Sequence, residues 1–129
     1  MKEVWVVDDD EEMGKAVGLM LQLLDYVPTH FLNPRPAAQA LLAGKQPELL
    51  ILDINMPEVS GLDMLEFLRR REEWKNLPVI MLSSEAADVM VEKAMQLGAD
   101  AYVMKPVTIE ELEKAMSQAF YKSIKNIKK

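Results

Sequence analysis

Four short segments of the 129-residue chain consist of apolar residues that do not alternate with polar ones, and they constrain the fold most strongly. A strand that is buried on both faces has this pattern, which is typical of parallel sheets covered by helices on both sides. A fifth segment, residues 27–32, contains Pro28. Because it is also interrupted by Thr29 and His30, we expect it at an edge of the sheet. The four uninterrupted segments are residues 4–7, 49–52, 79–82 and 101–104.

Segments with apolar residues at helical spacing lie between these strands and after the last one. Asp10 is the predicted N-cap of the first helix, and Thr108 with Glu111 predicts a capping box at the last. Gly44 and Gly98 are predicted to end the second and fourth helices. Five strands alternating with five helices predict an α/β fold, a doubly wound parallel sheet with right-handed crossovers. The predicted helices are residues 11–24, 36–43, 62–68, 90–97 and 109 to beyond 121.

Composition excludes several classes of function. The length fits one domain, residues 1–129. No apolar run is long enough to span a bilayer. The formal net charge of −6 argues against a nucleic-acid-binding surface. The absence of cysteine excludes disulfides and thiol chemistry and makes the cytoplasm the expected compartment. The one histidine, His30, excludes a multi-histidine metal site, and we expect it on the surface of the edge strand, away from the acidic end of the sheet.

Charged and hydroxyl side chains follow the predicted strands at the points where the strands end. Asp8 and Asp9 follow the first strand, and Asp53 follows the third. Ser83 follows the fourth strand, and Lys105 follows the fifth. Because a doubly wound sheet carries its functional crevice at the carboxyl ends of its strands, we expect these side chains to meet there.

Three carboxylates in one place have a specific chemical consequence. They repel one another by a few kcal/mol per pair at about 5 Å, so they require a cation or raised pKa values. Oxygen ligands without histidine or cysteine favour Mg²⁺ or a similar ion, which neutralises an incoming phosphoryl group and leaves one carboxylate as nucleophile. Lys105 adds a second positive charge, and Ser83 adds a hydroxyl donor. Each motif alone is equally compatible with a helix cap or a turn, but their combination at the strand ends favours a functional site over these structural roles.

These motifs, in this order along the chain, resemble the receiver domain of bacterial response regulators, most closely the single-domain chemotaxis type. The resemblance extends from residue 2 to about residue 119. It implies a flavodoxin-like fold with strand order 2-1-3-4-5. The motifs are Val-Val-Asp-Asp at residues 6–9, Leu-Asp-Ile-Asn-Met-Pro at 52–57 with Gly61, Pro-Val-Ile-Met-Leu-Ser at 78–83, and Gly-Ala-Asp-Ala-Tyr-Val-Met-Lys-Pro at 98–106.

The resemblance implies a role for each matching residue of the acidic site. Asp53 matches the phosphoacceptor of the family. Asp8, Asp9 and Asp53 match its metal ligands, and the backbone carbonyl of Asn55 matches the group that completes the metal site. The implied cofactor is Mg²⁺, for which we expect Mn²⁺ to substitute. Lys105 matches the lysine that the family carries at this strand end.

The resemblance also implies a switch and a control of its lifetime. Ser83 and Tyr102 match the hydroxyl and the aromatic side chain of the switch. Asn55 and Glu85 match two positions that tune dephosphorylation, and this polar and acidic pair predicts a short-lived phosphoryl group. Pro106 matches a proline that often follows a cis peptide bond.

We therefore expect a phosphorylation-activated signalling switch of a two-component system, which receives its phosphoryl group from a sensor histidine kinase. The expected output is contact with an unidentified downstream protein through the fourth helix, fifth strand and fifth helix, with no direct binding to nucleic acid or membrane. No enzymatic activity is expected beyond the chain's own phosphorylation and dephosphorylation. Three alternatives stay open: a receiver domain excised from a larger response regulator with a separate effector, a small Mg²⁺-dependent phosphatase that forms an aspartyl phosphate, and a receiver-like interaction module that is never phosphorylated.

Overall fold

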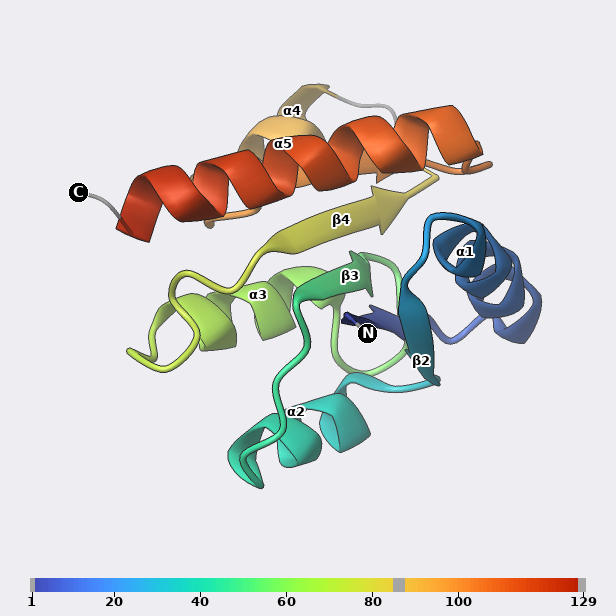
Figure 1. The fold of residues 1–129 in the computed structure, drawn as a ribbon. Helices are drawn as coiled ribbons and strands as arrows, with labels where there is room; N and C mark the ends of the chain where they lie inside the picture. Colours follow the sequence, from blue (N-terminus) through green and yellow to red (C-terminus); the bar gives the residue numbers. More distant parts are fainter. Residues whose placement is uncertain (1, 85–87, 128–129) are drawn as a thin grey trace.

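The computed structural model describes residues 2–84 and 88–127, and within them five strands alternate with five helices (Figure 1). The strands are β1 (Glu3–Val7), β2 (Val27–Phe31), β3 (Leu49–Asp53), β4 (Val79–Ser83) and β5 (Ala101–Met104). The helices are α1 (Glu11–Leu23), α2 (Pro34–Leu42), α3 (Gly61–Arg69), α4 (Asp88–Gln96) and α5 (Ile109–Ile127).

The five strands form one parallel sheet in the order β2-β1-β3-β4-β5. This order confirms the doubly wound, flavodoxin-like fold and the predicted edge position of β2. Val7 lies opposite Leu52, so the loop that follows β1 begins beside the end of β3. Asp53 lies opposite Leu82 at the end of β4. The carboxyl ends of the central strands therefore lie together at one edge of the sheet.

Helices cover both faces of the sheet (Figure 1). Ile51 belongs to the apolar core beneath α1 and α5, and its neighbour Leu52 belongs to the core beneath α2, α3 and α4. Successive side chains of a strand point to opposite faces, so a strand covered on both sides must be apolar at every position. This explains the apolar runs of β1, β3 and β4. None of the described helices is long and apolar enough to cross a membrane.

The helix ends follow the predicted capping chemistry. The side chain of Asp10 accepts two backbone hydrogen bonds from the first turn of α1, and the N–H of Glu111 donates to Oγ1 of Thr108 at 3.2 Å. Gly44 and Gly98 have φ angles of 97° and 107°, a left-handed conformation that favours glycine after a helix. The Asp10 N-cap and the two glycine helix ends are confirmed, and of the predicted capping box the structure shows the bond from Glu111 to Thr108.

The start of α2 differs from the prediction. Residues 36–43 were expected to be helical, but the helix is Pro34–Leu42. The side chain of Asn33 accepts a hydrogen bond from the N–H of Arg35, and Pro34 occupies the first turn, where it needs no hydrogen-bond partner. The sequence contains two prolines that could begin this helix, and the asparagine before the first one decides between them.

A buried ion pair joins α3 to the beginning of β5. A guanidinium nitrogen of Arg69 lies 3.0 Å from Oδ2 of Asp100, and the other two nitrogens donate to the carbonyls of Gly98 and Trp74. The same oxygen of Asp100 accepts a hydrogen bond of 2.9 Å from the N–H of Val79 at the beginning of β4. Burial raises the pKa of Asp100, although the N–H of Val79 and the charge of Arg69 oppose the shift. This network fixes the amino ends of β4 and β5.

We predict that Arg69→Met lowers the free energy of unfolding by about 3 kcal/mol, because it leaves the Asp100 carboxylate buried without its cation. Arg70→Met is the matched control, since Arg70 pairs with Glu66 at the surface and an exposed pair contributes at most about 1 kcal/mol. Urea unfolding of both variants measures the difference. Equal losses in the two variants would contradict the structural role of the Arg69 network.

Candidate functional site

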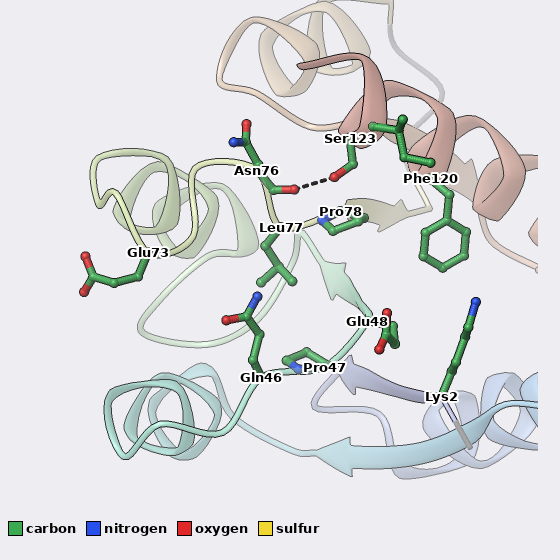
Figure 2. Close-up of a pocket in the computed structure, with 11 residues that line it drawn as sticks. Lys2, Gln46, Pro47, Glu48, Glu73, Asn76, Leu77, Pro78, Phe120 and Ser123 are labelled. Atoms are coloured by element: carbon green, nitrogen blue, oxygen red, sulfur yellow. Dashed lines mark hydrogen bonds between the residues drawn. The ribbon is translucent and has the colours of Figure 1, made fainter. Parts of the chain in front are cut away.

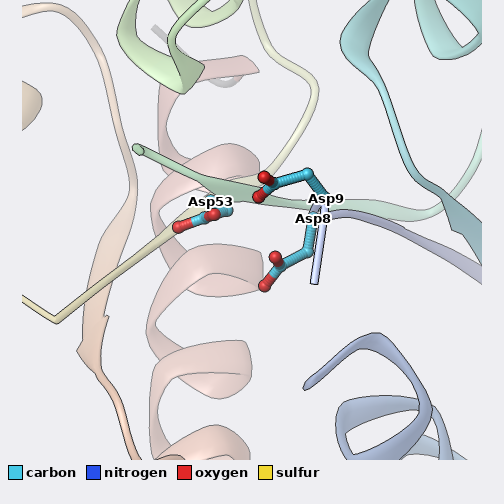
Figure 3. A group of neighbouring side chains, drawn as sticks. All are labelled: Asp8, Asp9 and Asp53. Carbon is cyan, nitrogen blue, oxygen red and sulfur yellow. The ribbon is translucent and has the colours of Figure 1, made fainter. Parts of the chain in front are cut away.

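Three aspartates converge at the carboxyl edge of the sheet (Figure 3). Asp8 and Asp9 lie in the loop between β1 and α1, and Asp53 ends β3. One carboxylate oxygen from each of them lies within 4.8 Å of those of the other two. Asp8 and Asp53 are buried, whereas Asp9 is exposed. The structure thus brings together the three carboxylates that the sequence places at separate strand ends.

Lys105 completes the cluster from the end of β5. Its Nζ lies 3.1 Å from Oδ2 of Asp8 and 3.2 Å from Oδ1 of Asp53. Its backbone N–H donates a hydrogen bond of 2.9 Å to the carbonyl of Ser83, which ties the segment after β5 to the end of β4. The peptide bond between Lys105 and Pro106 is cis, as the resemblance implies.

The pKa values of Asp53 and Lys105 are shifted in this cluster. Burial, and then the charge of Asp8, raise the pKa of Asp53 from 3.8 to about 6, although Lys105 and a backbone hydrogen bond from Asn55 oppose the shift. Burial disfavours the charged form of Lys105, but the attraction of Asp53 and Asp8 outweighs it and raises the pKa of Lys105 above its usual range. Asp53 therefore carries unfavourable electrostatic energy when it is ionised.

The carboxylate oxygens of the cluster suit a divalent cation. Oδ2 of Asp8 and Oδ1 of Asp53 are buried and share the single ammonium group of Lys105. One lysine faces three carboxylates, so the cluster keeps an excess of negative charge. A set of carboxylate oxygens with one exposed member, Asp9, fits a hard cation that retains several waters. The residues present therefore fit the Mg²⁺ that the resemblance implies.

The loop between β3 and α3 approaches the acidic site closely. The N–H of Gly61 donates a hydrogen bond of 3.0 Å to the carbonyl of Ile54. A Cβ atom at position 61 would overlap the backbone carbonyl oxygen of Asp53, so only glycine permits this approach. Asn55 lies in the same loop with an exposed side chain. Its backbone is thus held beside Asp53, while its side chain is open to solvent.

Two of the remaining predicted site residues lie on β4 and β5. Ser83 is fully buried and lies one position beyond Leu82, the residue opposite Asp53. Tyr102 is half-buried in β5 and packs against the core beneath α2, α3 and α4. Glu85 lies outside the described residues.

The prediction that His30 lies away from the acidic end of the sheet is wrong. Its Nε2 lies 2.8 Å from the backbone carbonyl oxygen of Asp8. Its ring packs where a side chain on Gly14 of α1 would otherwise lie. The sequence contains one signal of this contact, because Gly14 and Gly18 occupy buried positions four apart in a helix that glycine disfavours.

A hollow of about 670 Å³ lies at the opposite edge of the sheet, where the strands begin (Figure 2). Its lining includes Lys2, Glu48 and Pro78, which directly precede or begin the segments of β1, β3 and β4. Ser123 of α5 donates a hydrogen bond of 2.6 Å to the carbonyl of Asn76 beside this hollow (Figure 2). This contact anchors the end of α5. The hollow is separated from the carboxylates by the length of the strands, so we do not assign it to their chemistry.

Comparison with known proteins shows which family the chain resembles. The family model described as "Response regulator receiver domain" matches residues 4–117. The chemotaxis protein CheY of Pseudomonas aeruginosa is 30% identical over 118 residues, which are 92% of this chain and 95% of that protein. The phosphate regulon transcriptional regulatory protein PhoB of the same species is 28% identical over 111 residues, which are 86% of this chain and 48% of PhoB. Among solved structures, the chemotaxis protein CheY4 of Vibrio cholerae has a TM-score of 0.82 and 27% identity, over 92% of this chain and 98% of that one.

The chain belongs to the family of response regulator receiver domains. Members of this family are signalling switches of two-component systems rather than enzymes that act on outside substrates. Within the family the chain resembles the single-domain chemotaxis regulators, because its match to CheY extends over nearly all of both proteins. The resemblance recognised from the sequence motifs is confirmed.

We predict that Asp53→Asn stabilises the metal-free protein at pH 7 by about 3 kcal/mol. The pKa of Asp53 in the folded protein, about 6, exceeds its ordinary value of 3.8. The folded state therefore holds this proton more tightly than the unfolded chain, and the wild type loses stability as the pH rises from about 4 to about 6. Urea unfolding with a chelator present, at pH 4 and pH 7, measures this effect. A variant that is no more stable than wild type at pH 7 would contradict the electrostatic description of the site.

Proposed function

We propose that this protein is a phosphorylation-activated switch in which Asp53 accepts a phosphoryl group from a sensor histidine kinase in a Mg²⁺-dependent reaction. One observation carries the proposal. The buried carboxylate of Asp53 lies in one cluster with those of Asp8 and Asp9, and the single ammonium group of Lys105, 3.2 Å away, is shared between Asp53 and Asp8. At this strand end the carboxylate of Asp53 lies beside two other carboxylates and a lysine. This arrangement suits attack on a negatively charged phosphoryl group better than it suits a structural role.

In the proposed reaction, a carboxylate oxygen of Asp53 attacks the phosphorus atom of a phosphohistidine on the kinase. The phosphorus–nitrogen bond breaks, its electron pair leaves on the histidine ring, and an acyl phosphate remains on Asp53. Lys105 would place its ammonium group beside the oxygens of the transferred group. Mg²⁺, bound by Asp8, Asp9, Asp53 and the backbone carbonyl of Asn55, would supply the positive charge that neutralises those oxygens. Asn55 would also act with Glu85 on the water that removes the phosphoryl group.

The proposed output passes through Ser83 and Tyr102. A phosphoryl group on Asp53 adds negative charge and acceptor oxygens at the end of β3. The hydroxyl of Ser83, at the end of the neighbouring β4, would move to donate to one of them, and the half-buried ring of Tyr102 would move into the space behind it. These movements would change the surface of α4, β5 and α5, where a downstream protein would bind. Residues of this surface are Asp88, Glu92, Gln96, Tyr102 and Glu111.

Two alternatives have distinct tests. The first is a receiver domain joined to a separate effector, which would receive the signal within one protein. The segment of PhoB that matches this chain is only 48% of PhoB. A phosphatase would instead release phosphate repeatedly from an added phosphomonoester. The proposal expects at most one phosphoryl group per protein molecule and no turnover of such a substrate.

We predict that acetyl phosphate with Mg²⁺ adds one phosphoryl group to the wild type, and that Asp53→Asn abolishes this addition because the variant lacks the nucleophile. Without a divalent cation the wild type should react far more slowly, since the carboxylates then repel the donor. Intact-protein mass spectrometry measures the addition. Asp25→Asn is the control, because Asp25 is exposed beyond the end of α1 and has a positive φ that asparagine tolerates. Equal uptake of phosphate by wild type and Asp53→Asn would refute the assignment.

We predict that Ser83→Ala uncouples phosphorylation from the output surface. The variant should still react at Asp53, because the metal site and the nucleophile are intact. Beryllofluoride, which stands in for the phosphoryl group, should shift amide NMR signals over α4, β5 and α5 in the wild type but much less in the variant. Ser84→Ala, which changes the adjacent exposed serine, should keep the wild-type shifts. Shifts of wild-type size in Ser83→Ala would show that Ser83 is not the coupling residue.

A further inference from the structure

We propose that His30 is a positioning residue for the divalent-cation site, because its ring fixes the backbone of the loop that carries Asp8 and Asp9. This inference rests on the proposed function, which assigns a Mg²⁺ ion to these carboxylates. His30 belongs to β2 at the edge of the sheet, and none of the sequence motifs that identify the site includes it. Its link to the site is a single hydrogen bond of 2.8 Å between Nε2 and the carbonyl oxygen of Asp8.

The polar groups of Asp8 show what this bond does. The backbone N–H of Asp8 donates to the carbonyl of Phe31 at 3.0 Å, and its backbone carbonyl accepts from His30. Its Oδ1 accepts from the N–H of Asp10 at 2.9 Å. Oδ2 is left facing Lys105 and the cluster. Both backbone groups of Asp8 are therefore held by the last two residues of β2, and the direction of Oδ2 is set by these three bonds.

The acceptor determines the role of the ring. A backbone carbonyl can only accept, so Nε2 of His30 must carry the hydrogen and donate it. This donation exists in the neutral ring with the proton on Nε2 and also in the protonated ring, so the contact does not require a change of charge. The proposed role is therefore geometric. It positions two ligands without adding a ligand of its own.

The surroundings of the ring show that α1 is shaped around it. A Cβ atom on Gly14 would overlap the imidazole ring, and Gly18, one turn later, faces Pro28 of the same strand. His30 lies opposite Val6 in the register of β1 and β2, on the face covered by α1. Glycine is disfavoured in the middle of a helix, and Gly14 leaves the room that the ring of His30 requires, whereas a Cβ atom on Gly18 would make only ordinary contact with Pro28. The space occupied by His30 is thus provided by a second element of the fold.

The test is the dissociation constant for Mg²⁺ alone, measured on the full chain by amide NMR shifts of the β1–α1 loop. His30→Phe keeps a ring of similar size but cannot donate, and we expect it to weaken Mg²⁺ binding roughly tenfold, as loss of an outer partner of a metal ligand often does. His30→Gln places an amide nitrogen near the position of Nε2, and we expect an affinity within about twofold of wild type. Pro28→Ala, on the same face of β2 but without contact to Asp8, is the matched control and should bind as wild type does.

A second variant approaches the ring from α1. Gly14→Ala adds the methyl group that overlaps the ring, so it should weaken Mg²⁺ binding about as much as His30→Ala does. The double variant should be no weaker than His30→Ala alone, because both changes remove the same contact. The role of His30 is overturned if His30→Phe binds Mg²⁺ as tightly as wild type, or if His30→Gln is as weak as His30→Phe. Absence of saturable Mg²⁺ binding in the wild type would instead overturn the metal site of the proposed function, and this role with it.

Discussion

The crowding of three carboxylates around one lysine is the constraint on which the rest of this structure depends. Asp8 and Asp53 are buried within 4.8 Å of each other and of Asp9, and burial with mutual repulsion raises the pKa of Asp53 to about 6. Lys105 reduces this repulsion without removing it. Such an arrangement persists only where the surrounding fold holds it, and it favours any ligand that brings positive charge. The chemistry of the cluster therefore suits a bound cation.

The fold holds the cluster with apolar packing and a few directed hydrogen bonds. The central strands are covered on both faces, so their ends cannot separate without exposing the core. At the cluster itself, Gly61 lets the loop after β3 fold back against Asp53, and β2 holds the backbone of Asp8 through Phe31 and His30. The Arg69–Asp100 network secures the opposite edge of the sheet, at the beginnings of β4 and β5. The edge at the strand beginnings thus contains the buried ion pair, and the edge at the strand ends contains the carboxylate cluster.

Much of this arrangement could be predicted from the sequence. The apolar runs identify the buried strands because a strand covered on both faces leaves no place for polar side chains, and the motifs at the strand ends identify Asp8, Asp53 and Lys105. Two predictions failed, one at a contact between distant segments and one at the start of a helix. Because the strands are parallel, the end of residues 27–32 lies at the acidic edge, and only the hydrogen bond from His30 to Asp8 needed the structure to be seen. The start of α2 was misplaced because two prolines offered the same signal and Asn33 settled it.

The most direct test of the central claim is thermal unfolding of the wild type at pH 7 with increasing Mg²⁺, beside the variant Asp9→Asn. A cation that binds the folded cluster and not the unfolded chain must raise the melting temperature as its concentration rises. We predict that the melting temperature of the wild type increases with Mg²⁺, and that Asp9→Asn, which loses one exposed carboxylate ligand, shows a much smaller increase. A wild-type melting temperature that does not depend on Mg²⁺ would contradict the proposal that these carboxylates form a cation site.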